Sequence, residues 1–317
     1  MACKRTKTIY FFGAGASAAE APTTPTSSEI YRLVRQGLVG EDARFETLRA
    51  FLAAWAPGGF KHMPTTEELL SVIDACLAKG EPIGEAWSIS QLAKVREELV
   101  TCLYRFIGVS SLPDHPGRDH GVYQRLLDRV GADDTSLISL NYDLLLDRAI
   151  ARVGLRPDYQ LDFERLDQDD PEGRPLKLFK LHGSLNWCYC TSCFTTVRIG
   201  PVQALCDAAC RLCGGRLEAL IIPPTPLKVA PSPFLSALWK KAEWELTQAR
   251  EIVFIGYSLS EADANIRYLL FRSFFGYAPE VKVVLNRADA VVRGRYERLF
   301  PGGVRFYWEG FERFLGP

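Results

Sequence analysis

The sequence predicts an α/β fold: a doubly wound parallel sheet with an inserted helical subdomain and a small cysteine-rich module. Three observations lead to this prediction. A short apolar segment, Ile9–Phe12, runs into the glycine turn Gly13-Ala-Gly15 near the start of the chain. After residue 135, apolar segments alternate with helical patterns, which is the order of a parallel sheet with helical crossovers. Six of the nine cysteines fall between residues 188 and 213.

The first strand and its turn have the composition of a nucleotide-binding element. Ile9–Phe12 is aromatic and β-branched, which favours a strand buried on both faces. Gly13-x-Gly15-x-x-Ala18 fits the dinucleotide fingerprint, and we expect its glycines to take backbone angles that other residues avoid. Ser17-Ala-Ala-Glu20 predicts a capping box that opens a helix. The combination favours an anion site for a pyrophosphate, with an ordinary glycine-rich turn as the alternative.

A helical insertion is expected between the first and second strands. Amphipathic patterns cover Glu29–Leu38 and Arg44–Trp55, a capping box lies at Thr65–Glu68, and a long helical stretch covers Trp87–Phe106. We therefore predict a helical insertion over residues 27–131. Its exposed face is the expected surface for self-association or partner contact.

Polar residues and glycines follow each later strand that we expect. The strands are 136–140, 176–181, 252–255 and 281–285, and they are followed by Asn141-Tyr142-Asp143, His182-Gly183, Gly256-Tyr257-Ser258 and Asn286. In doubly wound sheets the carboxyl ends of the strands converge on one ligand crevice, so the pattern predicts a Rossmann-like site. Taken singly, Asn141 could cap the next helix, and His182 could be a structural histidine. Dehydrogenases carry an acidic residue at the end of a second strand, about 20 residues after the glycines, whereas the equivalent region here is expected to be a Pro/Thr loop and a helix.

Bulk composition excludes several classes of protein. The chain has 317 residues, of which 47% are hydrophobic, enough for a large core. Lysine plus arginine equals aspartate plus glutamate, at 38 each, so there is no electrostatic reason to expect direct nucleic-acid binding. Apolar stretches stay well below transmembrane length, and we expect a cytoplasmic protein without membrane contact.

Five short motifs resemble the sirtuin-like family, the silent-information-regulator NAD-consuming enzymes. They are GAGAS at 13–17, LNYD at 140–143, LHGS at 181–184, GYSL at 256–259 and LN at 285–286. The resemblance implies that NAD is bound as a substrate. It implies catalytic roles for Asn141, Asp143 and His182. It also implies NAD contacts from Gly13, Ala14, Gly15, Ser17, Gly256, Ser258 and Asn286.

The cysteine segment has the spacing of a zinc site. Cys190-x-x-Cys193 and Cys210-x-x-Cys213 are separated by 16 residues. Four thiolates form a closed tetrahedral site, which is structural rather than catalytic. The resembled family carries a zinc-ribbon module at this point, which we place at residues 187–216. Cys188 and Cys206 are extra; alternative ligands and buried thiols are both possible roles, and we favour buried thiols.

The motifs also differ from those of protein-deacylating sirtuins. Those enzymes follow the serine of the first motif with Gly-Ile-Pro-Asp-Phe-Arg, whereas here Ser17 is followed by Ala-Ala-Glu-Ala-Pro. HGSLNW, IIPPT and GYSLSEAD resemble a divergent bacterial branch whose members often act in anti-phage defence as NAD-hydrolysing effectors. The resemblance therefore implies hydrolysis of NAD to nicotinamide and ADP-ribose, by a homo-oligomer or with a sensor or ATPase partner protein. The alternatives are an NAD-dependent protein-lysine deacylase and a non-catalytic sensor of NAD or ADP-ribose.

Overall fold

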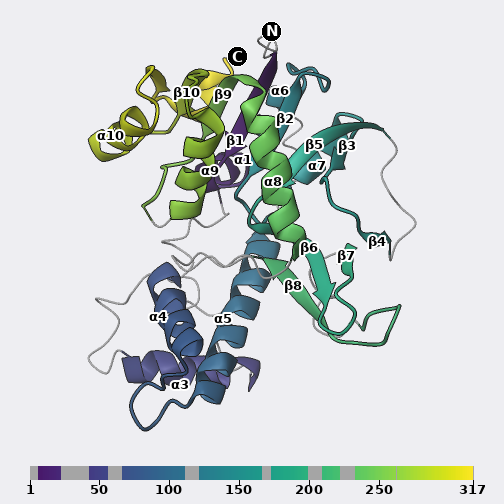
Figure 1. The fold of residues 1–317 in the computed structure, drawn as a ribbon, viewed down its shortest axis with the longest axis vertical. Helices are drawn as coiled ribbons and strands as arrows, with labels where there is room; N and C mark the ends of the chain where they lie inside the picture. Colours follow the sequence, from purple (N-terminus) through teal and green to yellow (C-terminus); the bar gives the residue numbers. More distant parts are fainter. Residues whose placement is uncertain are drawn as a thin grey trace. The chain divides into compact units, whose positions relative to one another are not determined.

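The chain folds into two compact units, shown in Figure 1. The first comprises Met1–Thr24, Ser111–Ile221 and Ala230–Pro317, and the second comprises Pro25–Ser110 and Ile222–Val229. The computed structural model describes residues 6–22, 43–55, 66–110, 121–165, 173–198, 209–221, 233–261 and 263–316.

The first unit contains the predicted parallel sheet. Its seven strands lie in the order β11-β10-β9-β1-β2-β5-β3, and every neighbouring pair is parallel. The strands are β1 Lys7–Phe12, β2 Thr135–Ser139, β3 Leu155–Asp158, β5 Arg174–Lys180, β9 Ala249–Ile255, β10 Glu280–Val284 and β11 Val304–Tyr307. This arrangement confirms the doubly wound, Rossmann-like sheet.

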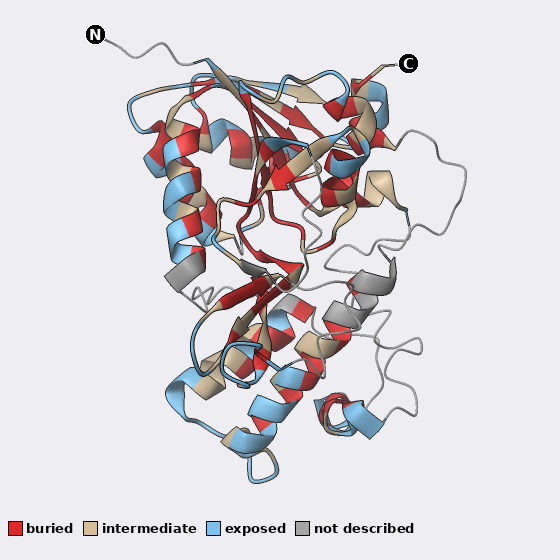
Figure 2. Ribbon diagram, turned by 90° about the vertical axis from the view of Figure 1, so that its right-hand side faces the viewer, coloured by how far each residue is buried: buried red, intermediate tan, exposed pale blue. Residues whose placement is uncertain are grey.

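Burial of apolar strands and helix faces holds this sheet in place. Ile9, Phe11 and Phe12 of β1 are fully buried, and β2 is buried along its whole length. Figure 2 shows buried residues concentrated on the strands and exposed residues on the outer sides of the helices. The helices of this unit are α1 Ala14–Glu20, α6 Val122–Leu127, α7 Leu145–Arg152, α8 Pro233–Thr247, α9 Ala264–Phe274, α10 Ala290–Leu299 and α11 Gly310–Phe314. Each large apolar side chain buried in this way stabilises the fold by about 1.5–3 kcal/mol.

The direction of winding reverses beside β1. From β1 the chain forms β2 and then the edge strand β3, fills the place between them with β5, and later returns to β9 on the other side of β1. In doubly wound folds, ligands bind outside the carboxyl ends of the strands at such a switch point. The turns at Gly13 and Gly256 lie there.

The glycines at the switch point are needed for close approach of two backbones. Gly13 has a φ of −111°, and neither Gly13 nor Gly15 has a positive φ, so the expected unusual angles are wrong. A Cβ on Gly13 would instead lie 2.7 Å from the carbonyl oxygen of Gly256, while the Gly15 N–H donates to that oxygen at 2.9 Å. The capping box at Ser17 is also wrong, because α1 begins at Ala14 with Gly13 as its N-cap.

Gly256→Ala is expected to destabilise the protein far more than Gly154→Ala. Both glycines have a positive φ, 63° at Gly256 and 72° at Gly154. A Cβ at Gly256 would lie 2.1 Å from the backbone nitrogen of Ala16, whereas a Cβ at Gly154 meets nothing within 4 Å. Gly154→Ala should therefore cost only the backbone strain of about 1 kcal/mol, and Gly256→Ala at least about 2 kcal/mol more. Urea unfolding measures both, and equal losses would show that the close approach is unimportant.

A second, smaller sheet of the first unit carries the cysteines. Its order is β4-β7-β6-β8, with β4 Glu164–Arg165, β6 Gly183–Cys190, β7 Thr196–Arg198 and β8 Leu217–Ile221. Strand β6 pairs antiparallel with both β7 and β8. Only Leu181 and His182 separate the end of β5 from the start of β6, so the two sheets are joined at His182.

The described residues of the second unit are mainly helical. They form a short 3-10 turn at Ala43–Phe45 and the helices α3 Glu46–Trp55, α4 Thr66–Lys79 and α5 Ile89–Ser110. The helix expected at 29–38 lies outside the described residues, and α6 groups with the first unit. The bounds 27–131 for an insertion stay a prediction. Among the described residues, no helix combines the length and the apolar character needed to cross a lipid bilayer.

Candidate active site and metal centre

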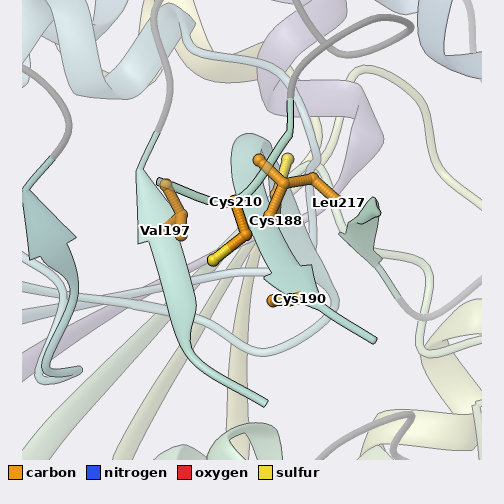
Figure 3. Close-up of a cluster of buried hydrophobic side chains, with 5 residues drawn as sticks. All are labelled: Cys188, Cys190, Val197, Cys210 and Leu217. Carbon is orange, nitrogen blue, oxygen red and sulfur yellow. The ribbon is translucent and has the colours of Figure 1, made fainter. Parts of the chain in front are cut away.

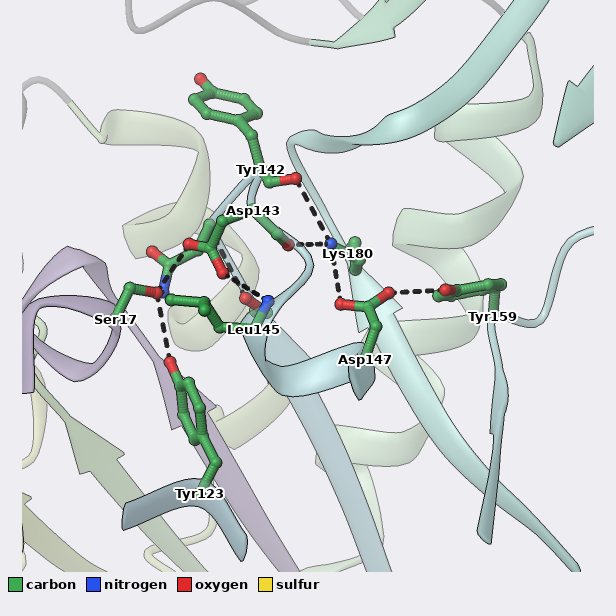
Figure 4. Close-up of polar contacts among 10 residues, drawn as sticks. Ser17, Tyr123, Tyr142, Asp143, Leu145, Asp147, Tyr159 and Lys180 are labelled. Atoms are coloured by element: carbon green, nitrogen blue, oxygen red, sulfur yellow. Dashed lines mark hydrogen bonds and ion pairs between the residues drawn. The ribbon is translucent and has the colours of Figure 1, made fainter. Parts of the chain in front are cut away.

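Ser17 is the centre of a buried hydrogen-bond network at the end of β1. Its side chain lies on α1, and the residue is only 1% exposed. Its hydroxyl accepts a hydrogen bond from Asn141 Nδ2 at 2.8 Å and donates to Asp143 Oδ2 at 2.7 Å, as Figure 4 shows for Asp143. The hydroxyl of Tyr123 on α6 lies 3.2 Å away. Because Ser17 has a single hydrogen, which goes to Asp143, Tyr123 is the donor in this last contact.

Asn141 connects the turn after β2 to the turn after β1. Its amide nitrogen donates to Ser17 Oγ and also to the backbone carbonyl oxygen of Gly13, at 3.0 Å. Both amide hydrogens are thus committed within the protein. The remaining polar atom of the side chain, Oδ1, is an acceptor. Asn141 can therefore orient a water molecule or a ligand hydroxyl by accepting its hydrogen.

Asp143 is buried and binds the start of α7. Its Oδ1 accepts the backbone N–H of Leu145, the first residue of α7, at 3.0 Å, although the N-cap position itself is Leu144. Burial raises the pKa of the Asp143 carboxyl above its ordinary value, against the opposing charge of Lys180 and the hydrogen bond from Ser17. The network thus contains a carboxyl group whose ionisation depends on its neighbours.

His182 follows the strand next to the one that carries Asn141. Strands β2 and β5 pair with Ser139 opposite Lys180, so Asn141 and His182 both lie two residues beyond this pair. His182 is buried, and the centre of its ring lies 6.3 Å from that of the Tyr142 ring. The structure brings Ser17, Asn141 and Asp143 into one bonded network and places His182 at the adjacent strand end.

The other predicted NAD contacts lie at the neighbouring strand ends. Gly13 and Gly15 pack at the switch point against the Gly256 turn, and Ala14 between them is the first residue of α1. Ser258 is exposed after β9, and its carbonyl oxygen accepts from Arg295 Nη1 at 3.4 Å. Asn286 is exposed after β10. Contact of these residues with a ligand stays a prediction.

Four cysteines form a site that fits zinc. The Sγ atoms of Cys190, Cys193, Cys210 and Cys213 all lie within 4.8 Å of one another. The Sγ atoms of Cys190 and Cys213 are 3.4 Å apart, and those of Cys193 and Cys210 are 3.7 Å apart. Zn–S bonds of about 2.3 Å in a tetrahedron place the sulfurs about 3.8 Å apart. The donor set and its spacing therefore suit a structural zinc ion held by these four residues.

Cys188 belongs to the apolar packing behind this site. Figure 3 shows it in a buried cluster with Cys190, Cys210, Val197 and Leu217. Burial raises the pKa of the Cys188 thiol to about 12, and this thiol is not part of the four-cysteine cluster. Cys206 lies outside the described residues.

The two cysteine pairs sit on turns of the same geometry. The Phe194 N–H donates to the Cys190 carbonyl at 3.0 Å, and the Gly214 N–H donates to the Cys210 carbonyl at 2.8 Å. The residue after each second cysteine is left-handed, with a φ of 59° at Phe194 and 72° at Gly214. Glycine suits this conformation, whereas phenylalanine is strained in it.

Phe194→Gly is expected to stabilise the protein by about 0.5–1 kcal/mol, because it relieves this strain. Little packing is lost, since Phe194 is 60% exposed. Phe194→Ala is the matched control, because it removes the same ring but keeps a Cβ at a positive φ. Denaturant unfolding should show a gain for glycine alone, and an equal effect of both substitutions would contradict the strain argument.

Comparison with known proteins identifies the family. A family model described as a SIR2-like domain matches residues 135–296, slightly more than half of the chain. The chain therefore belongs to the SIR2-like family. A comparison of the chain with curated proteins found no match.

Solved structures agree with this fold. A mutant Sir2 homologue in complex with 2′-O-acetyl ADP ribose matches with a TM-score of 0.51 and 18% identity, over 98% of this chain and 88% of that one. A Sir2 homologue in complex with NAD matches with a TM-score of 0.50 and 16% identity, over 98% and 89%. At these identities the likeness concerns the fold.

Proposed function

We propose that this SIR2-like chain hydrolyses NAD to nicotinamide and ADP-ribose, with water as the acceptor. The observation that carries the proposal is the bonded network of Ser17, Asn141 and Asp143, with His182 at the adjacent strand end. Family membership and the similarly folded Sir2 homologue in complex with NAD support NAD as the ligand.

The proposed reaction breaks the bond between nicotinamide and the ribose. Nicotinamide leaves with the bonding electron pair, positive charge develops on the sugar, and the oxygen of water bonds to the anomeric carbon and loses a proton. Asn141 Oδ1 accepts a hydrogen from this water or from a ribose hydroxyl. His182 takes the proton or binds a ribose hydroxyl near neutral pH. The negative charge of Asp143 favours the cationic transition state.

The remainder of NAD is assigned to the other strand ends. Gly13, Ala14 and Gly15 face the pyrophosphate, and Gly256, Ser258 and Asn286 face the adenosine half. The hydroxyl of Ser17 is already shared by Asn141, Asp143 and Tyr123. In this proposal Ser17 therefore acts mainly by orienting Asn141 rather than by binding the pyrophosphate with its side chain.

The segment after Ser17 favours hydrolysis over deacylation. The helix α1 continues through Glu20, whose carboxylate accepts the backbone N–H of Tyr123 at 2.9 Å. The Phe and Arg that deacylating sirtuins carry in this segment are absent from its sequence. An NAD-dependent protein-lysine deacylase remains the second candidate, because it would use the same fold.

The test is the consumption of NAD by purified protein, with and without an acetylated peptide. Chromatography should detect nicotinamide and ADP-ribose in equal amounts without peptide, and water enriched in ¹⁸O should label the ADP-ribose. Consumption that requires peptide, with one peptide deacetylated per NAD, would replace the hydrolase proposal with the deacylase.

We place this activity in anti-phage defence, in the bacterial cytoplasm, in a homo-oligomer or with a sensor or ATPase partner protein. The helical second unit is the proposed contact surface. Cells carrying the wild type should lose NAD on phage infection, and cells carrying His182→Ala should not. Constant NAD in infected wild-type cells, despite activity of the purified protein, would contradict the defence role alone.

A further inference from the structure

Lys180 has a buried ammonium group that contacts the backbone of the turn carrying Asn141 and Asp143. It is the last residue of β5 and only 1% exposed. Its ammonium donates to the backbone carbonyl of Asp143 at 2.6 Å, to Asp147 Oδ2 at 3.1 Å and to the backbone carbonyl of Tyr142 at 3.5 Å, as Figure 4 shows. An ammonium group has three hydrogens, and each has an acceptor here.

Asp147 anchors this ammonium to α7. It is buried near the start of the helix, and its Oδ1 accepts the hydroxyl of Tyr159 at 2.5 Å. A buried ion pair gains little stability over well-packed apolar residues, because both charges must leave water. The hydrogen-bonded series of Tyr159, Asp147 and Lys180 therefore indicates a role beyond stability. Its last member, Lys180, donates to two backbone carbonyls of the turn that carries Asn141 and Asp143.

We propose that Lys180 is a positioning residue of the candidate active site. It fixes the Tyr142–Asp143 backbone, so that Asn141 and Asp143 face Ser17, and it joins this turn to the strand that leads to His182. The inference deepens the proposed NAD hydrolysis and rests on it.

Electrostatics supports the same role. The charged and titratable groups around Asp143 are Lys180 from β5, Asp147 and Arg148 from α7, and Tyr123 from α6. Burial raises the pKa of Asp143, the charge of Asp147 raises it further, and the charge of Lys180 lowers it. Removal of Lys180 should therefore raise this pKa, so that Asp143 is protonated at a higher pH than in the wild type.

Lys180→Met is the direct test. We expect kcat for NAD cleavage to fall about 10²-fold with KM within threefold, because misplaced groups lose the oriented contacts of the transition state. The acid limb of the pH–rate profile should move to higher pH. Tyr159→Phe is a milder second variant that keeps the ion pair. It should also lower kcat and move the acid limb of the pH–rate profile to higher pH, each by a smaller amount.

Glu245→Gln is the matched control. Glu245 on α8 is only 2% exposed and binds Lys7 of β1 at 2.6 Å as well as Lys177 of β5. Its substitution should lower the melting temperature as a disrupted buried ion pair does, without changing kcat or the pH profile. Equal kcat and equal pH profiles for Lys180→Met and Glu245→Gln would overturn the positioning role.

Crystal structures separate this inference from the proposed function. In Lys180→Met, Asn141 Nδ2 should no longer lie within hydrogen-bond distance of Ser17 Oγ, whether or not the wild type cleaves NAD. If the wild type fails to cleave NAD but the turn moves, the proposed function fails and the positioning role stands. An unmoved turn overturns the positioning role. If Lys180→Met does not fold, Tyr159→Phe is examined in the same way.

Discussion

His182→Ala is expected to lower the rate of NAD cleavage by about 10²–10⁴-fold, the usual contribution of a general acid or base. In the proposed mechanism the imidazole accepts the proton of the attacking water, and His182 follows β5, the strand that pairs with β2 ahead of Asn141. His182 is not part of the proposed zinc site, and it is not among the largest fully buried side chains, so the fold should survive its loss. Steady-state release of nicotinamide measures the effect, and thermal unfolding confirms the fold.

Asn141→Asp tests whether activity depends on the hydrogen bonds that the Asn141 amide donates or only on the size of the side chain. The substitution keeps the size of the side chain but replaces the donor to Gly13 O and Ser17 Oγ with an acceptor. The rate of NAD cleavage should therefore fall strongly, although the side chain keeps its size.

A His182→Ala variant that keeps more than a tenth of the wild-type rate would remove His182 from the proposed mechanism.

Loss of the metal centre is expected to have the largest effect on stability. The wild type should contain one zinc ion per chain, and Cys190→Ser should release it. Structural zinc sites supply folding free energy directly, so a fall in melting temperature on the order of 10 °C or more is expected. Elemental analysis and thermal unfolding are the measurements, and a chelator should have the same effect on the wild type.

Cys76→Ser is the control for this series, because Cys76 is a half-buried thiol of α4 that is not part of the four-cysteine cluster. Its substitution should leave the zinc content unchanged and shift the melting temperature by only a few degrees. Soluble, freshly purified wild type without zinc would show that the four cysteines have another role.

The parallel sheet could be predicted because most of its strands are buried apolar segments separated by helical patterns. Strand β3 was not predicted. It reads Leu-Arg-Pro-Asp, and it is the last of the described strands on its side of the sheet, an edge position in which proline is tolerated. Such a strand forms because β5 offers it a partner, and its own sequence carries almost no strand signal.

The site could be predicted only in part. The rule that ligands bind at carboxyl strand ends selected Asn141, Asp143 and His182, but nothing local links Ser17 to Tyr123, which lies 106 residues away. For Lys180 a signal existed. It shares its side of β5 with the buried Leu176 and Leu178, so strict alternation places a charge on the apolar face.

The position of β1 in the sheet has a consequence for synthesis of the chain. Strand β1 is made first, but its two neighbours begin at Thr135 and Ala249. At ordinary elongation rates of about 5–20 residues per second, roughly ten seconds separate the two neighbours. During that interval one edge of β1 has unpaired backbone groups, to which a strand of another chain could bind. The turn at Gly256, against which Gly13 and Gly15 pack, is also still missing, so a nascent chain that already carries Asn141 and His182 has no complete switch point.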